Sequence, residues 1–397
     1  MLFTLQPADG HLNPMLGLAA ALRDAGHEVV FATSGAYVPR IEARGHRAVA
    51  VGMDWLESQG PVTPPPADDP TGHRSIFARL FLRETAREMA ADLLDEVGTL
   101  RPDLIIGESF EFAGPAVAER ADIPFATFDL SFPVDHEVMV KTGDIEDDRD
   151  LDALRSHIGL DPATDPDWFR GALQISTFPD RYRETQEDAR QAHGLRRSRS
   201  PDVVIRPPVL DGVDDADVPG WVEGLEDAVY VSLGTIFTRW FPEVLSTAAA
   251  GAATLGRSTV VTYGASADPA MLELPDAPHV HVADYVPQGA VLDRCRAAVT
   301  HGGTGTTLGA LARGVPVVVI PLGADQFGHA RSVRELGAGL VLEHGGLTAE
   351  AVATAARSVV EDDSYAAGAA EIAADLAALP PPSHAVPALE DYAGVRR

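Results

Sequence analysis

Residues 284–329 decide the fold of this chain and read DYVPQGAVLDRCRAAVTHGGTGTTLGALARGVPVVVIPLGADQFGH. An apolar run at 297–300 meets the glycine-rich HGG at 301–303, and a helical pattern follows over 304–313. This order predicts a strand, a tight turn and a helix. Glycines let the backbone approach a ligand closely, and the free N–H groups at a helix start suit a phosphate. The stretch therefore predicts an anion site in an α/β sheet.

The next segment, 316–321, is a continuous apolar run of the kind buried in a parallel sheet. It delivers Asp325 and Gln326 to the carboxyl end of its strand. Ligands of open α/β sheets bind at that edge. Both side chains are therefore candidates for ligand contact.

The amino-terminal part repeats the same order of strand, glycine turn and helix. A short strand at 2–5 leads into a turn that carries His11, with Asn13 as the predicted cap of the following helix and Pro14 in its first turn. Strands at 29–33 and 47–51 complete a doubly wound unit. The sequence therefore predicts two α/β domains, each opened by a glycine turn.

Length, charge and cysteine content limit the possible classes of protein. A chain of 397 residues exceeds what one core usually organises, so two domains are expected. A net charge of −28 argues against nucleic acid or an anionic membrane as partner. No apolar run approaches the ~20 residues that cross a bilayer, and no signal peptide is evident. The single cysteine, Cys295, is expected in the helix before HGG and fits a reducing cytoplasm.

Four short motifs occur in a fixed order: VPQ at 286–288, HGGTGT at 301–306, GVP at 314–316 and DQ at 325–326. Together they resemble the nucleotide-binding signature of the UDP-glycosyltransferase superfamily, in its bacterial antibiotic-tailoring form. The resemblance implies the α/β fold GT-B, two Rossmann-like domains that face each other across a cleft. The expected division is an acceptor-binding domain at 1–200, a linker at 201–226, a nucleotide-sugar domain at 227–378 and a final helix at 379–397 that returns to the first domain.

The activity implied is an inverting transfer of a deoxysugar from a nucleotide diphosphate to a hydroxyl of a hydrophobic natural-product aglycone. Such a reaction needs a base, and an imidazole titrates near neutral pH. The resemblance assigns this role to His11. Glu108, at the end of the strand 103–107, matches the position of its acidic partner, with Asp9 and Glu111 as competitors. The chain could also form a homodimer.

The resemblance implies a donor site in the second domain. The diphosphate would contact Ser232, Thr235, His301, Gly303, Gly305 and Thr306. The base would lie against Tyr285, Val286 and Gln288, and the donor sugar against Asp325 and Gln326. A helix terminus contributes up to ~2 kcal/mol, so several donors together could replace a cation. Neither a metal nor a cofactor is expected.

Two departures from the plant enzymes of this superfamily bear on the donor. Gly309 stands where those enzymes carry a ribose-binding glutamate, and Tyr285 stands where they carry a tryptophan. Loss of the ribose contact is compatible with a thymidine diphosphate sugar, so a dTDP-sugar is favoured over a UDP-sugar. His329 replaces a frequent asparagine. The aromatic candidates for acceptor contact are Trp55, Phe77, Phe81, Phe110, Phe112 and Phe132.

Other functions would need features that this sequence lacks or shows only weakly. The acidic pairs Asp150 with Asp152 and Asp215 with Asp217 could hold a metal, but their solvated setting favours a surface role. A nicotinamide oxidoreductase needs a ribose-binding acid ~20 residues after its glycines, and none is evident near Val333. A non-catalytic nucleotide-sugar-binding helper, an epimerase and a cell-wall transferase remain alternatives, the last disfavoured by the acidic charge.

Overall fold

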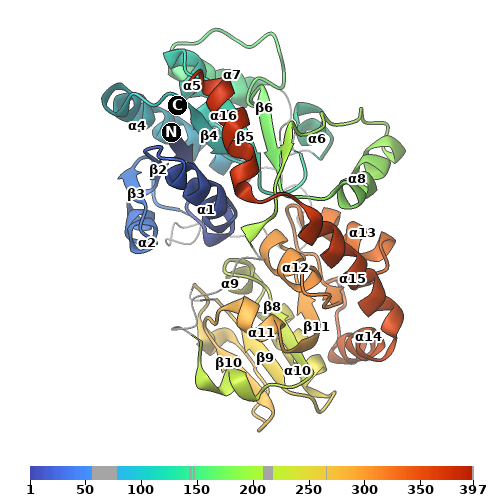
Figure 1. Cartoon of the computed structure of the whole chain (residues 1–397). Coiled ribbons are helices and arrows are strands. Elements are labelled where there is room, and N and C mark those ends of the chain that lie inside the picture. Colours follow the sequence, from blue (N-terminus) through green and yellow to red (C-terminus); the bar gives the residue numbers. More distant parts are fainter. Residues whose placement is uncertain are drawn as a thin grey trace. The chain divides into compact units, whose positions relative to one another are not determined.

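The computed structural model describes residues 1–55, 78–133, 135–142, 145, 148–208, 218–264 and 266–395. Its contacts divide into two α/β units (Figure 1). Unit 1 contains Met1–Phe178, Arg190–Ile205 and Pro380–Arg397, and unit 2 contains Pro179–Ala189 and Arg206–Leu379. Phe77, Asp215 and Asp217 lie outside the described residues.

Unit 1 is built on a seven-stranded parallel sheet with the strand order β3-β2-β1-β4-β5-β6-β7. The strands are β1 (Leu2–Thr4), β2 (Val30–Thr33), β3 (Arg47–Ala50), β4 (Ile105–Glu108), β5 (Phe125–Asp129), β6 (Leu173–Ser176) and β7 (Val203–Val204). Because the order reverses direction beside β1, the carboxyl ends of β1 and β4 form the edge at which such folds bind ligands.

Helices cover both faces of this sheet. They are α1 (Asp9–Asp24), α2 (Val38–Ala43), α4 (Thr85–Leu100), α5 (Ala113–Ala121), α6 (His136–Thr142), α7 (Arg149–His157) and α16 (Val386–Ala393). On the face that α1 and α16 cover (Figure 1), Phe3 and Ile106 pack with Met15 of α1 and Leu389 of α16. Residues of α4, α5 and α7 form the core on the opposite face. Alternation along each strand divides the apolar residues between these two cores.

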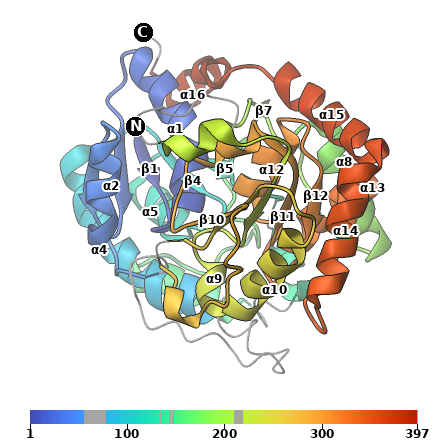
Figure 2. The same ribbon diagram turned by 90° about the horizontal axis from the view of Figure 1, so that it is seen from below.

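Unit 2 is built on a six-stranded parallel sheet with the order β10-β9-β8-β11-β12-β13. The strands are β8 (Ala228–Ser232), β9 (Thr259–Thr262), β10 (Val280–Ala283), β11 (Cys295–Thr300), β12 (Val317–Val319) and β13 (Gly339–Val341). Two helices that lie side by side, α10 (Pro242–Ala253) and α14 (Ala349–Glu361), cover one face (Figure 2). The remaining helices are α9 (Phe237–Trp240), α11 (Gln288–Leu292), α12 (Thr304–Leu311), α13 (Gln326–Glu335) and α15 (Asp363–Ala378).

Three local predictions are wrong. Helix α1 begins at Asp9 rather than after Asn13, so Pro14 lies inside it and His11 lies in its first turn. Asp9 in the first turn of α1 is favoured by the helix dipole. Pro14 lies near the start of the helix and removes only one backbone hydrogen bond. Cys295 opens strand β11 instead of lying in the preceding helix, and burial raises the pKa of its thiol to about 12.

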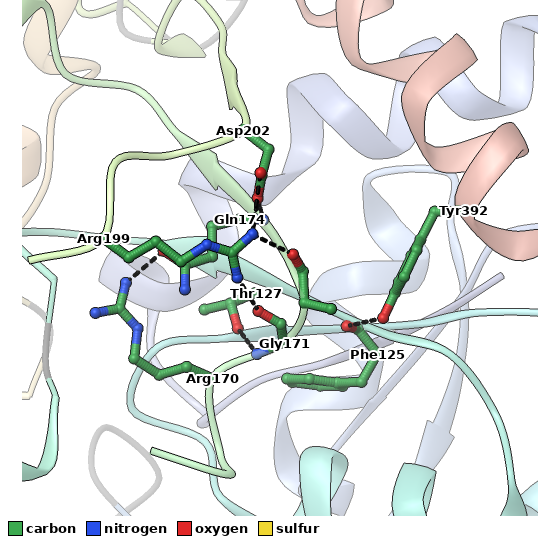
Figure 3. Close-up of polar contacts among 9 residues, drawn as sticks. Phe125, Thr127, Arg170, Gly171, Gln174, Arg199, Asp202 and Tyr392 are labelled. Atoms are coloured by element: carbon green, nitrogen blue, oxygen red, sulfur yellow. Dashed lines mark hydrogen bonds and ion pairs between the residues drawn. The ribbon is translucent and has the colours of Figure 1, made fainter. Parts of the chain in front are cut away.

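The expected linker at 201–226 is shorter in the structure, because β7 extends the sheet of unit 1. Arg199 donates to the carbonyl of Gly171 at 3.3 Å, and the carboxylate of Asp202 accepts from the backbone N–H of Gln174 at 2.8 Å (Figure 3). At the same end of the sheet, the hydroxyl of Tyr392 donates to the carbonyl of Phe125 at 3.2 Å. The expected first domain, 1–200, also differs from unit 1, because 179–189 fold with unit 2.

Candidate functional site

In unit 1, the first turn of α1 and the end of β4 bring two ionisable side chains together. The Nδ1 atom of His11 lies 2.8 Å from Oε1 of Glu108. The Glu108 side chain is fully buried, whereas the His11 side chain is 18% exposed. One edge of the imidazole therefore faces the buried carboxylate, and part of the ring remains accessible.

Backbone groups hold the Glu108 carboxylate in place. Its Oε2 atom accepts from the backbone N–H of Phe110 at 2.6 Å, and Oε1 accepts from that of Gln6 at 3.3 Å. A carboxylate only accepts hydrogen bonds, so the hydrogen on Nδ1 of His11 points to Glu108. The other ring nitrogen, Nε2, is then the one able to accept a proton.

The two competing acids are engaged elsewhere. Asp9 accepts from the hydroxyl of Tyr37 at 2.7 Å and from Arg40 at 3.3 Å. Glu111 accepts from the backbone N–H groups of Ala113 and Gly114 at the start of α5. Burial raises the pKa of Glu111 to about 7. Of the three candidate acids, Glu108 is thus the one that contacts His11.

An aromatic series continues from His11. The ring of Phe110 lies 6.2 Å from the imidazole, Phe81 lies 6.4 Å from Phe110, and Trp55 lies 4.7 Å from Phe81. Phe81 and Phe110 are half-buried, whereas Trp55 is buried and donates to the amide of Gln6. Phe81 and Phe110 therefore present apolar surface beside the imidazole.

The other aromatic candidates have different surroundings. Phe112 is a core residue, 1% exposed and packed against Phe169, so its predicted acceptor contact is wrong. Phe132 stacks on Phe178 with their ring centroids 5.5 Å apart.

In unit 2, the HGG turn joins β11 to α12. Gly302 has a φ of +93°, a conformation that L side chains rarely adopt. Gly303 is the N-cap of α12 and has no side chain to cap it, so the first N–H groups of Thr304 and Gly305 are oriented toward the helix start. This end of α12 has the geometry that binds anions.

The first residue of this turn, His301, is buried. Its side chain packs against Phe237, with ring centroids 5.3 Å apart, and the residue is only 6% exposed. Burial lowers the pKa of His301 to about 4. The imidazole is therefore neutral near pH 7 and contributes hydrogen bonding rather than positive charge.

The remaining diphosphate candidates lie near the same sheet edge. Ser232 ends β8 beside Thr300, and its oxygen accepts from Thr262 at 2.9 Å and from the N–H of Gly234 at 3.2 Å. Thr235 follows as a half-buried residue. Thr306 is buried in the first turn of α12.

The base and sugar candidates differ in exposure. Tyr285 is 61% exposed, whereas Val286 is buried. Gln288 donates to the carbonyl of Gly305 at 3.2 Å. Asp325 accepts from the hydroxyl of Thr304 at 2.8 Å.

Gln326 is only partly free to bind a sugar. It is 1% exposed, and its side-chain oxygen accepts from the backbone N–H groups of Leu322 at 2.7 Å and Gly323 at 3.0 Å. Its carbonyl therefore fixes the loop before α13, and only its amide N–H groups can point to a ligand.

Among the described residues, no group of three or more histidine, cysteine or acidic side chains has the geometry to hold a metal ion. Asp150, which could belong to a metal site, forms an ion pair with Arg83 at 2.6 Å. None of the helices in the described part of the chain is both long and apolar enough to cross a membrane.

Sequence reasoning missed one participant in the second site, Tyr182. Its hydroxyl lies 2.8 Å from Nδ1 of His329, a residue 147 positions later. No motif surrounds Tyr182, so only the folded structure reveals this contact.

Comparisons with known proteins identify the family of the chain. Residues 247–392 match the family model described as erythromycin biosynthesis protein CIII-like, C-terminal domain. The chain is 30% identical to the L-demethylnoviosyl transferase of Streptomyces niveus, over 96% of this chain and 95% of that protein. It is also 30% identical to the elloramycin glycosyltransferase ElmGT of Streptomyces olivaceus, over 95% and 93% respectively.

Solved structures extend the similarity over the whole chain. The crystal structure of glycosyltransferase VinC in complex with dTDP superposes with a TM-score of 0.77 at 26% identity, covering 99% of each chain. The glycosyltransferase SsfS6 complexed with thymidine diphosphate has a TM-score of 0.72 at 25% identity, covering 98% of this chain and 99% of that one. With a relative of 30% identity across nearly its full length, the chain belongs to the GT-B glycosyltransferases of antibiotic and natural-product biosynthesis.

Proposed function

We propose that this glycosyltransferase moves a deoxysugar from a dTDP-sugar to a hydroxyl of a hydrophobic aglycone, with inversion and with His11 as general base. The observation that carries the proposal is the 2.8 Å contact between Nδ1 of His11 and Oε1 of Glu108. An imidazole fixed by a carboxylate on one nitrogen is suited to accept a proton on the other.

The proposed step requires a single displacement. Nε2 of His11 takes the proton of the acceptor hydroxyl while that oxygen attacks the anomeric carbon of the donor. The bond from that carbon to the diphosphate oxygen breaks, and TDP leaves with the electron pair. The buried Glu108 carboxylate stabilises the imidazolium that results. Attack from the face opposite the leaving group inverts the configuration.

The leaving diphosphate would be bound at the start of α12. The N–H groups after Gly303 and the helix dipole favour negative charge there, and His301 adds a neutral imidazole. This donor set supports a transfer that does not depend on a divalent cation. Full turnover in EDTA would agree with that proposal, and restoration of activity by Mg²⁺ would contradict it.

Two observations favour a thymidine nucleotide. Gly309 has no side chain to bind a ribose 2′-hydroxyl, and a Cβ there would lie 3.3 Å from the side-chain nitrogen of Gln288. A larger residue would displace Gln288, which already donates to Gly305. The structurally similar VinC is described in complex with dTDP.

The half-buried rings of Phe81 and Phe110 beside His11 favour an apolar acceptor. Aromatic rings at such a site contribute apolar contact area, while the acceptor hydroxyl would meet the imidazole.

The first experiment is isothermal titration of the purified protein with TDP, UDP and NAD, without metal. TDP binding that persists in His11→Ala, together with loss of sugar transfer in an aglycone screen, would support the assignment. A loss of transfer of about 10²–10⁴-fold is expected for removal of a general base.

Three other results would redirect the assignment. Binding of NAD without TDP or UDP would contradict the proposed nucleotide-sugar donor. TDP affinity that collapses in His11→Ala would give this histidine a donor-binding role. TDP binding without transfer to any aglycone in the wild type would favour the non-catalytic helper.

A further inference from the structure

Helix α8 (Asp180–Ala192) contributes its first turns to unit 2. Tyr182, Thr185 and Gln186 share one helix face, because residues three and four apart are neighbours on a helix. The hydroxyl of Thr185 lies 2.6 Å from that of Ser332, and Gln186 donates to the carbonyl of Gly328 at 2.8 Å. These contacts attach α8 to α13.

Tyr182 extends this attachment into a series of four polar groups. Its hydroxyl lies 2.8 Å from Nδ1 of His329, whose Nε2 lies 2.9 Å from the hydroxyl of Thr304. Thr304 in turn donates to Oδ2 of Asp325 at 2.8 Å. Tyr182 and His329 are both fully buried. The series ends at the first residue of α12 and at the acid that precedes α13.

The number of hydrogens on each group sets the direction of these bonds. Thr304 has one hydroxyl hydrogen, which goes to the Asp325 carboxylate, so Nε2 of His329 must donate to Thr304. Nδ1 faces the hydroxyl of Tyr182, and burial raises the pKa of that hydroxyl, which therefore keeps its hydrogen. Donation from Tyr182 to Nδ1 selects the tautomer with hydrogen on Nε2.

We propose that Tyr182 and His329 are positioning residues, which fix Thr304 and Asp325 in the orientation that binds the donor sugar. This inference rests on the proposed function, since it assumes that the start of α12 binds the diphosphate. Thr304 donates to Oδ2 of Asp325, and Nε2 of His329 lies 3.4 Å from the same oxygen, so these two residues fix the orientation in which the carboxylate meets a sugar hydroxyl. The tyrosine and histidine act only through these two residues.

The proposal separates sugar recognition from nucleotide recognition. A change at Tyr182 or His329 should weaken binding of a dTDP-sugar and leave binding of dTDP unchanged. A loss of about 3- to 10-fold is expected, the size of one hydrogen bond within a buried network. A purely structural role would weaken both ligands together.

The test is isothermal titration of the full chain with dTDP and with dTDP-glucose as the sugar-bearing probe. The variants are Tyr182→Phe, His329→Asn and His329→Gln. Glutamine places an N–H donor near the position of Nε2, whereas asparagine places its amide near Nδ1. We therefore expect His329→Gln to keep the preference for dTDP-glucose and His329→Asn to lose it, along with Tyr182→Phe.

A double variant tests the tautomer argument directly. Glutamine needs no partner to select a tautomer, so Tyr182→Phe should have a smaller effect in the His329→Gln background than in the wild type. Equal effects in both backgrounds would overturn the link between the two residues. The matched control is Tyr37→Phe in unit 1, which removes a buried hydroxyl that contacts Asp9 and should not change the preference.

The remaining outcomes are distinct. A wild type that binds neither ligand would overturn the proposed function itself. Equal wild-type affinity for dTDP and dTDP-glucose would overturn sugar binding by Asp325 and this inference with it. Unchanged preference in both Tyr182→Phe and His329→Asn, with melting temperatures showing folded protein, would overturn the positioning role while leaving the proposed function intact.

Discussion

The position of a Cβ atom on Gly303 lies 2.4 Å from Nε2 of His301, so the HGG turn has no room for a side chain there. The histidine cannot easily retreat, because it is buried against Phe237 and a Cβ on Gly234 would lie 2.9 Å from its Cε1 atom. Close packing of the imidazole between two glycines therefore determines where α12 begins.

Gly303→Ala should lower stability by about 1–3 kcal/mol, the usual cost of overpacking, and weaken TDP binding at least tenfold. The reason is that either His301 or the start of α12 must move. Urea unfolding and isothermal titration with TDP measure the two effects. Gly305→Ala is the stability control, since no atom lies within 4 Å of its added Cβ. Equal stability of the two variants would contradict the steric argument.

Glu108→Gln tests the role of charge beside the base. Glutamine preserves the shape of the side chain but removes the negative charge that would stabilise protonated His11. We expect kcat to fall about 10²-fold while the Kd for TDP stays unchanged. Initial-rate kinetics with an aglycone identified by the screen measure this. Because backbone N–H groups of Gln6 and Phe110 also bind Glu108, a melting curve must accompany the kinetics. A folded variant with wild-type kcat would exclude a catalytic role for the charge.

The parts of the fold that follow from local pattern were predictable. Apolar runs located β1, β2, β4, β11 and β12, because buried parallel strands are continuously apolar. Strands β6, β7 and β13 were not predicted. Strands β7 and β13 lie at the edges of their sheets and β6 lies beside β7, so their sequences need not be continuously apolar.

The site was predictable where a motif carries its own geometry. The HGG turn precedes α12 as expected, since glycine, turn and helix start are adjacent in sequence. Side-chain partners that are distant in sequence were less accessible. Tyr182 contacts His329 across 147 residues, and the carbonyl of Gln326 is used by its own loop, neither of which any local pattern indicates.

Glu111→Gln should remove a pH dependence from the stability of unit 1. Burial raises the pKa of Glu111 from 4.5 to about 7, so the folded state keeps its proton while the unfolded chain releases it. Between pH 4.5 and about 7 the free energy of unfolding therefore falls as pH rises, by roughly 3 kcal/mol, and changes no further above that range. The glutamine variant should gain stability relative to wild type at pH 8 but not at pH 4.5.

The measurement of Glu111→Gln needs a signal specific to unit 1, because a chain of two units need not unfold in one step. Two of the four tryptophans, Trp55 and Trp168, lie in unit 1, and Trp221 and Trp240 lie in unit 2. Replacement of Trp221 and Trp240 by phenylalanine leaves tryptophan fluorescence from unit 1 alone. A constant stability difference across pH would show that Glu111 does not titrate in this range.

His301→Gln should produce the opposite change in unit 2. Burial lowers the pKa of His301 from 6.5 to about 4, so the unfolded chain binds a proton in this range while the folded state does not. This contribution to the stability of unit 2 is therefore fully present above pH 6.5 and is lost as pH falls toward 4, by roughly 3 kcal/mol.

With Trp55 and Trp168 replaced by phenylalanine, tryptophan fluorescence reports the unfolding of unit 2. The His301→Gln variant should then show a smaller change of unfolding free energy with pH. Each variant is compared with the protein that carries the same tryptophan replacements and the native residue. The contributions of other titrating groups to the pH dependence of stability therefore cancel. Opposite slopes in the two units, each removed by its own variant, would establish that Glu111 and His301 are buried in their uncharged forms, whereas a common slope would refute it.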